Sequence, residues 1–170
     1  MSNDSKFIAI IFGLTFLVIF GAAFLRQTTS GDNQPDPTNP VETLAVSPQP
    51  FSFGDVSYSG GIVSKTFTLK NNSDQVMKIV RIDTSCMCTK AAVKVGQSQT
   101  AFYGMEMSGI PNPKVDVNIP AGGEAEVIAS FDPAAHGLAG IGSFDRTIHL
   151  ILSEPSGYKD VNFSGTVINK

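Results

Sequence analysis

The stretch GGEAEVIASF, residues 122–131, carries the clearest secondary-structure signal in the chain. Two glycines form a turn, after which apolar and polar side chains alternate. Ala125, Val127, Ala129 and Phe131 share one face, and Glu124, Glu126 and Ser130 share the other. A period of two residues is typical of a β-strand with one buried and one solvated face. Residues 124–131 are therefore predicted to form a half-buried strand.

Short alternating runs of the same kind lie on both sides of this strand. Turn residues such as Gly60-Gly61 and Glu154-Pro155-Ser156-Gly157 separate them. The predicted strands begin at Phe51, cover Ile62–Lys70 and Val76–Ile82, and include Ile148–Leu152 and Val161–Val167. A break in the alternation at Ile79-Val80 predicts a β-bulge. Because no stretch after Pro50 has a helical period, residues 50–170 are predicted to form an all-β sandwich of about seven or eight strands.

The N-terminal part of the chain differs from the rest in composition. Residues 7–25, FIAIIFGLTFLVIFGAAFL, contain no charge and are long enough to span a bilayer as a helix of roughly 28 Å. They are predicted to form a transmembrane helix that leaves residues 1–6 in the cytoplasm and the C-terminal domain outside. The alternative is a cleaved secretory signal, although its apolar region is usually shorter. Either interpretation exports the rest of the chain.

Residues 26–49 are predicted to be a flexible, acidic linker. From Gln27 to Gln49 the chain has four prolines, three acids and no basic residue, a composition that buries too little apolar surface to fold. A first strand at Val41–Val46 is the alternative. The net charge of the whole chain is −3, and no basic stripe is present, so nucleic-acid binding is not expected.

The two cysteines of the chain, Cys86 and Cys88, form the one motif that suggests chemistry. In an extended strand their Cα atoms would lie about 6.5–7 Å apart, so a disulfide between them requires a local turn. Three interpretations stay open: buried structural cysteines, a thiol-redox pair, or two soft ligands for Cu(I) or zinc. Met105 and Met107 are the candidate further sulfur ligands, and His136 or His149 is a candidate imidazole ligand.

A long apolar insert, residues 101–111, interrupts the series of strands. It holds aromatic and thioether side chains where a connection between strands is expected. The candidate partner-binding residues are Phe102, Tyr103, Met105 and Ile110. An exposed apolar loop favours contact with a protein partner, and the alternative is a lid packed over the open end of the sandwich.

Four pieces of the sequence give a resemblance to a known family. They are Phe51–Val56 (FSFGDV), Thr66–Asn72 (TFTLKNN), Thr84–Thr89 (TSCMCT), and Pro120–Glu124 leading to Ser130–Pro133. Together they resemble a bacterial Ig-like domain family of unknown function, related in fold to major sperm protein and Hydin-type sandwiches. The chain departs from that pattern at Met87, where the family usually has glycine, and in the length of Ala91–Asn118. The resemblance implies an Ig-like fold and export, and it implies no reaction.

These observations predict a single-pass protein of the cytoplasmic membrane whose extracytoplasmic Ig-like domain binds or scaffolds a partner. The expected partners are the lipid bilayer, through residues 7–25, and another envelope or membrane protein. No enzyme activity is expected, because the chain has no phosphate-binding glycine loop, no Gly-x-Ser-x-Gly elbow and no His-Glu-x-x-His pair. No cofactor is expected. The alternative function is Cu(I) binding or thiol-redox chemistry at the Cys86-Met87-Cys88 motif.

Overall fold

A computed structural model describes residues 38–107 and 110–170. The predicted cytoplasmic N-terminus, the transmembrane helix at 7–25 and most of the linker lie outside the described residues. Among the residues that are described, no helix has the length and apolar character needed to cross a membrane.

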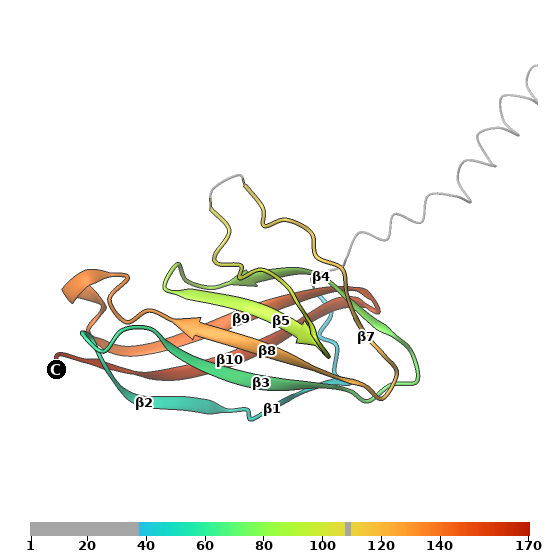
Figure 1. Cartoon of the computed structure of the whole chain (residues 1–170), viewed down its shortest axis with the longest axis horizontal. Helices are drawn as coiled ribbons and strands as arrows, with labels where there is room; N and C mark the ends of the chain where they lie inside the picture. Colours follow the sequence, from blue (N-terminus) through green and yellow to red (C-terminus); the bar gives the residue numbers. More distant parts are fainter. Residues whose placement is uncertain (1–37, 108–109) are drawn as a thin grey trace, which may run out of the picture. The chain divides into compact units, whose positions relative to one another are not determined.

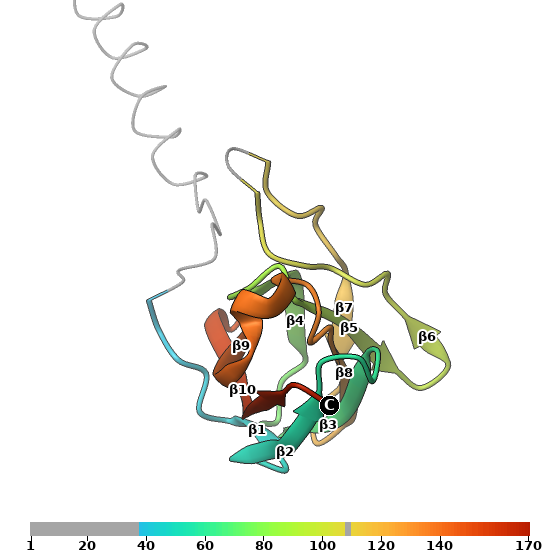
Figure 2. The same cartoon turned by 90° about the vertical axis from the view of Figure 1, so that its left-hand side faces the viewer.

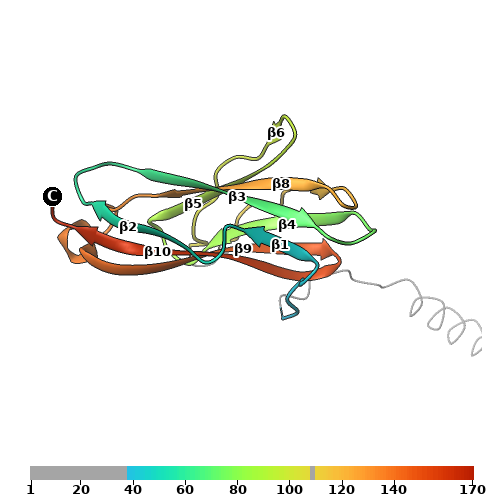
Figure 3. The same ribbon diagram turned by 90° about the horizontal axis from the view of Figure 1, so that it is seen from below.

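The described chain forms two five-stranded sheets that pack face to face (Figures 1 and 3). The first sheet has the strand order β1-β3-β8-β5-β6, and the second has the order β2-β10-β9-β4-β7. In chain order the strands are β1 (Leu44–Ser47), β2 (Phe51–Ser57), β3 (Val63–Asn71), β4 (Met77–Thr84), β5 (Thr89–Val95), β6 (Ser98–Gln99), β7 (Val117–Ile119), β8 (Glu124–Phe131), β9 (Gly142–Glu154) and β10 (Ser156–Ile168). A short 3₁₀-helix, Gly137–Gly140, lies between β8 and β9. The prediction of an all-β sandwich is confirmed.

The alternation that predicted β8 determines which side chains enter the core. Ala125, Val127, Ala129 and Phe131 are all buried, and β8 pairs antiparallel with β3 so that Leu69 lies opposite Ala125. Phenylalanines from both sheets meet between the layers. Phe131 stacks on Phe144 with 4.2 Å between ring centroids, and the Phe163 ring packs edge-on against both of these rings. Aromatic packing across the sheets stabilises the sandwich in the absence of tryptophan.

The predicted bulge in β4 is confirmed. The register between β4 and β9 shifts between Lys78 and Ile79 and again between Ile79 and Arg81. The shift lets both Ile79 and Ile82 point into the core, where each is fully buried. A strict alternation would have sent the two side chains to opposite faces of the sheet.

The number of strands and the start of the domain differ from the prediction. The structure has ten strands in its described part, against the seven or eight predicted. The strands β1, β6 and β7 are too short to show an alternating pattern. β5 has seven residues but buries Ala91, Ala92 and Val93 in succession, so it does not alternate. β1 falls inside residues 26–49, which were expected to be linker, and it pairs with β3. Leu44 and the preceding Val41 are buried in the core. The folded domain therefore begins before Pro50, and the alternative of a strand near 41–46 is closer to what is observed.

Candidate functional site

Cys86 and Cys88 lie in the tight turn between β4 and β5, called here the cysteine turn (residues 85–88). The backbone N–H of Thr89 donates to the carbonyl of Cys86 at 3.0 Å and closes the turn. The buried hydroxyl of Thr84 lies 3.1 Å from the carbonyl oxygens of both Cys86 and Thr89. The turn brings the two cysteine Cα atoms to 5.3 Å, and the sulfurs form a disulfide. The expectation that a bridge requires a local turn is thus confirmed.

The two sulfurs of this disulfide belong to residues with different exposure. Cys88 is buried, with 3% of its surface exposed, and it is part of the hydrophobic core. Cys86 is only partly buried, and the Met87 side chain between them is 57% exposed. A molecule in solution therefore meets Cys86 and Met87 before it meets Cys88.

His136 is the first side chain that the fold adds to this pair. Its Nε2 atom lies 3.1 Å from Sγ of Cys86, although 50 positions separate the two residues. The β8–β9 connection is held near the turn because the N–H of Asp132 donates to the carbonyl of Cys88 at 2.9 Å. Figures 1 and 2 show this connection (orange) and the β4–β5 turn (light green) at the same end of the sandwich. Once the disulfide is reduced, the exposed imidazole lies within hydrogen-bond distance of the Cys86 sulfur and can serve it as a proton donor or acceptor.

Arg146 on β9 contacts the other sulfur. Its Nε–H donates to Sγ of Cys88 at 3.0 Å, and its Nη1 atom donates to the carbonyl of Asp145 at 2.7 Å. The guanidinium also lies over the ring of Phe144, 5.7 Å from the centroid. These contacts place a permanent positive charge next to a buried sulfur. Sequence reasoning missed Arg146, because no local pattern links it to a cysteine 58 positions away.

The sulfurs of Cys86 and Cys88 and an imidazole nitrogen of His136 all lie within 4.8 Å of one another. Two thiolates and one imidazole form a soft donor set that suits Cu(I) or zinc once the disulfide is reduced. His149, the other candidate imidazole, contacts Asp160 instead, with 2.8 Å between its Nδ1 atom and the carboxylate. The structure therefore selects His136 over His149 as the candidate third ligand.

Met105 and Met107, the predicted sulfur ligands, lie in a different segment, the β6–β7 connection (residues 100–116). This connection runs from the edge of the first sheet to the edge of the second (Figure 2). Tyr103 exchanges two backbone hydrogen bonds of 2.8 Å with Ala91 on β5, and the N–H of Val115 donates to the carbonyl of Val80 on β4. The connection thus covers one open side of the sandwich. A ligand role for the two methionines stays a prediction.

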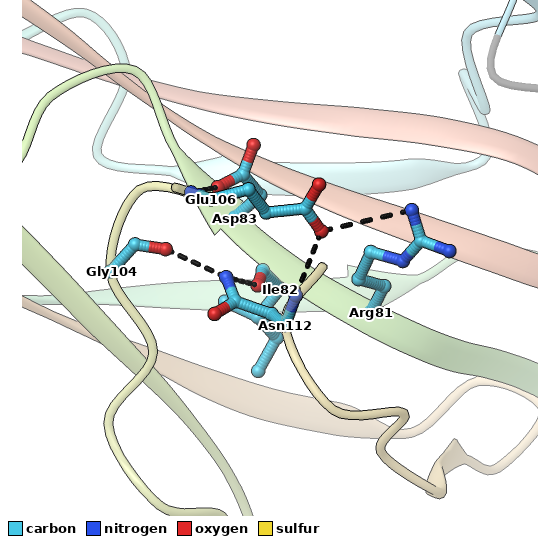
Figure 4. Close-up of polar contacts among 6 residues, drawn as sticks. All are labelled: Arg81, Ile82, Asp83, Gly104, Glu106 and Asn112. Atoms are coloured by element: carbon cyan, nitrogen blue, oxygen red, sulfur yellow. Dashed lines mark hydrogen bonds and ion pairs between the residues drawn. The ribbon is translucent and has the colours of Figure 1, made fainter. Parts of the chain in front are cut away.

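Asn112 and Glu106 fix the connection to β4 (Figure 4). The Nδ2 group of Asn112 donates to the carbonyl of Ile82 at 2.9 Å and to that of Gly104 at 2.7 Å. The carboxylate of Glu106 accepts from the N–H of Asn112 at 3.1 Å and lies 3.7 Å from Arg81. The N–H of Glu106 donates to Asp83 at 2.8 Å. These bonds hold Gly104, Glu106 and Asn112 of the connection in place beside β4.

Apolar side chains of the connection remain in contact with solvent. Phe102 is 46% exposed, Ile110 is 74% exposed, and Met105 and Met107 are also exposed. Tyr103 differs from them, since its side chain is half-buried and packs against the core. Of the four predicted partner-binding residues, Phe102, Met105 and Ile110 are accessible, whereas Tyr103 serves as an anchor.

Comparison with known proteins finds one family model that matches the N-terminal part of the domain. Residues 44–100 match the family described as "Protein of unknown function (DUF1573)". This range includes both cysteines, whereas His136, Arg146 and the apolar part of the β6–β7 connection lie outside it. No curated protein matches the sequence.

Solved structures with a similar fold share little sequence with this chain. A protein of unknown function from Porphyromonas gingivalis W83 has a TM-score of 0.50 and 13% identity, and the match covers 69% of this chain and 43% of that one. The chain thus spans less than half the length of that protein. The PapD-like domain 7 of human CEP192 has a TM-score of 0.41 and 16% identity, covering 81% of this chain and 93% of the domain. WR4, a member of the MSP family from C. elegans, has a TM-score of 0.41 and 9% identity, covering 74% and 98%.

The likeness to the Porphyromonas gingivalis protein agrees with the observed fold. A shared fold does not identify an activity. The family match agrees with three of the four sequence pieces that gave the resemblance, which lie within residues 44–100. The resemblance inferred from the sequence is therefore confirmed: residues 44–100 of this β-sandwich match the DUF1573 family of unknown function.

Proposed function

We propose that the chain is a membrane-tethered, extracytoplasmic Ig-like module that binds an envelope protein and has no catalytic activity of its own. The apolar stretch at residues 7–25 supports a tether in the cytoplasmic membrane. The two-sheet sandwich supports a binding module, since such folds commonly present loops to partners from a rigid scaffold. The partner in this proposal is a protein rather than a nucleic acid, in keeping with the net charge of −3.

The observation that carries this proposal is the β6–β7 connection. It presents Phe102, Met105 and Ile110 to solvent from a backbone that Asn112, Glu106 and Tyr103 hold against β4 and β5. A surface whose backbone is already ordered loses less conformational entropy on binding than a flexible loop does. Exposed aromatic and thioether side chains are also enriched at protein interfaces.

Site-specific crosslinking in intact cells tests the binding surface. We expect a photoreactive residue at position 102 or 110 of the full chain to give a discrete adduct with an envelope protein. The variant Phe102→Ser/Met105→Ser/Ile110→Ser should bind the same partner at least about tenfold more weakly, as the loss of two or three apolar contacts predicts. Ile62→Ser/Leu138→Ser is the matched control, because both residues are exposed apolar side chains outside the connection. Equal weakening by both variants would argue against the connection as the surface.

Protease protection tests the tether and its orientation. In cells with a permeable outer barrier, an added protease should reach residues 38–170 while residues 7–25 stay in the membrane fraction. Release of the whole chain by a high-salt wash would contradict a spanning segment. Protection of the C-terminal domain would contradict the proposed orientation.

A second candidate function is thiol–disulfide exchange or soft-metal binding at the cysteine turn. The 3.1 Å contact between His136 and Cys86 favours it, since an imidazole next to a sulfur serves both proton transfer and metal binding. Thiol titration under graded reduction tests the exchange. Competition with a coloured Cu(I) chelator tests the metal site in the fully reduced protein.

In that competition, His136→Gln should weaken Cu(I) binding at least about tenfold, because losing a ligand costs no less than losing the hydrogen-bond partner of a ligand. His149→Gln is the matched control and should leave the affinity unchanged, since that histidine contacts Asp160. Retention of full affinity in His136→Gln would remove the histidine from the site. No Cu(I) uptake by the reduced protein would exclude the metal function.

A further inference from the structure

We propose that the Cys86–Cys88 disulfide exchanges in a fixed direction: an incoming thiolate attacks Sγ of Cys86, and Cys88 leaves as a thiolate held by Arg146. This inference rests on the second proposed function, exchange of that disulfide. The reacting partner is a cysteine pair of another exported protein, which supplies both the attacking thiolate and the second thiol.

Access favours Cys86 as the sulfur that is attacked. Its side chain is partly exposed, whereas Cys88 is 3% exposed and packs in the hydrophobic core. Attack on a disulfide requires the new sulfur to approach along the S–S axis from the side opposite the leaving sulfur. For attack on Cys88, that approach would have to displace core side chains or Arg146.

Charge favours Cys88 as the sulfur that leaves. When the S–S bond breaks, its electron pair stays on the leaving sulfur, and a stabilised thiolate leaves faster. The Nε–H of Arg146 is already 3.0 Å from Sγ of Cys88 in the disulfide form. The guanidinium is also restrained by Asp145 and by the Phe144 ring, so little reorganisation is needed when the negative charge appears.

His136 completes the cycle on the other sulfur. The first step forms a mixed disulfide between the partner and Cys86 and releases the Cys88 thiolate. The second thiolate of the partner then attacks the partner sulfur that is bonded to Cys86. The partner's two sulfurs form a disulfide, and the bond to Cys86 breaks. His136, 3.1 Å from Sγ of Cys86, can give this sulfur a proton and can take it back for the reverse reaction. Overall, the protein disulfide is reduced to two thiols while the partner dithiol becomes a disulfide.

Trapping of the mixed disulfide tests the direction of attack. The oxidised full chain in detergent is mixed briefly with glutathione, quenched with N-ethylmaleimide in denaturant, and cleaved with cyanogen bromide at Met87, which lies between the cysteines. We expect glutathione on the Cys86 peptide and N-ethylmaleimide on the Cys88 peptide, by about ten to one or more. An equal split, or glutathione mainly on Cys88, would overturn the inference.

Variants of Arg146 test the role of the charge. Reduction by dithiothreitol should slow about three- to tenfold in Arg146→Gln and stay near the wild-type rate in Arg146→Lys, which keeps the charge. Arg81→Gln is the matched control, because it removes a partly exposed arginine that contacts Glu106 instead. Circular dichroism checks that each variant is folded. A folded Arg146→Gln that reacts as fast as the wild type would overturn the role of Arg146.

The outcomes separate this inference from the function on which it rests. If the disulfide of the folded chain resists both glutathione and dithiothreitol, exchange itself is wrong and the inference falls with it. If exchange occurs at Cys88, or without any dependence on Arg146, exchange stands and only the proposed direction is wrong.

Discussion

The cysteine turn and the β6–β7 connection are both irregular segments attached to β4 and β5, but the fold holds them in different ways. The cysteine turn receives its chemically active contacts from distant elements, with His136 from the β8–β9 connection and Arg146 from β9. The β6–β7 connection is held by amide and carboxylate groups that replace missing strand partners at the edge of β4. The first arrangement places reactive groups together, and the second gives apolar side chains an ordered backbone.

This difference predicts that the two segments can be disturbed separately. Removing the anchors of the β6–β7 connection should weaken partner binding and leave the disulfide chemistry unchanged. Removing the support of the cysteine turn should change the rate of reduction and leave the exposed apolar surface intact. Variants that alter only partner binding or only disulfide reduction would confirm that the two regions are independent. A variant that alters both would contradict this independence.

The largest effect is expected for Asn112→Ala. Its amide donates two separate hydrogen bonds, to Ile82 and to Gly104, so the variant leaves two carbonyl groups without this partner. We expect a loss of about 2–3 kcal/mol in the free energy of unfolding, measured by urea denaturation. Asn118→Ala is the control, because Asn118 is exposed and its amide donates to the neighbouring carboxylate of Asp116 at 3.1 Å. A loss in Asn112→Ala no larger than in this control would show that the amide anchor is unimportant.

Thr84→Val is expected to have a smaller effect on stability. One hydroxyl hydrogen is shared between two carbonyl groups of the cysteine turn, and the valine keeps the shape of the side chain. The expected loss is about 1–2 kcal/mol, together with faster reduction of the disulfide because the turn is less ordered. Thr68→Val on the exposed face of β3 is the control for the change in side chain. If Thr84→Val is destabilised but its disulfide is reduced at the wild-type rate, the hydroxyl contributes to stability and not to the reactivity of the disulfide.

Cys86→Ser/Cys88→Ser should cost about 1.6 kcal/mol, because a loop of only three residues restricts the unfolded chain weakly. Thermal unfolding of this variant, compared with the oxidised wild type, measures the contribution, and the reduced wild type is the control for the two substitutions themselves. Binding through the β6–β7 connection should be unchanged. A loss of about 4 kcal/mol or more would instead favour a structural role for the disulfide.

Glu106→Gln should have the smallest effect, below about 1 kcal/mol. The amide keeps an oxygen for the N–H of Asn112, and the pair lost with Arg81 is 3.7 Å long and partly solvated. Denaturation at low and high salt measures this pair directly. If the difference in unfolding free energy between Glu106→Gln and the wild type is the same at low and high salt, the ion pair has no measurable role.

The sequence allowed prediction of the strands that alternate over many residues, and of the bulge that interrupts one of them. β8 and the break at Ile79-Val80 were predictable because burial dictates a period of two residues. β6, with two residues, and β7, with three, are defined by their pairing partners, so no local pattern announces them. The same reason applies to β1, which has four residues and is defined by its pairing with β3.

The candidate site was only half predictable. Cys86 and Cys88 are visible because two cysteines one residue apart are uncommon, and His136 was one of two imidazoles considered. Its contact with Cys86 and the contact of Arg146 with Cys88 depend on how the β8–β9 connection and β9 pass the turn, which is a property of the tertiary fold. Methionines 105 and 107 were proposed from spacing alone, and spacing does not determine the path of a long connection.

The burial of Val41 and Leu44 has a practical consequence for anyone who wants a soluble fragment. Starting at Pro50, where the sequence pattern changes, would delete β1. The backbone groups of β3 that face β1 along Thr68–Asn71 would then lose their partners. A bare strand of this kind invites a second molecule to pair with it, and such a preparation would tend to aggregate. A fragment that begins at or before Thr38 keeps β1 as its own edge strand, so the edge of β3 stays covered.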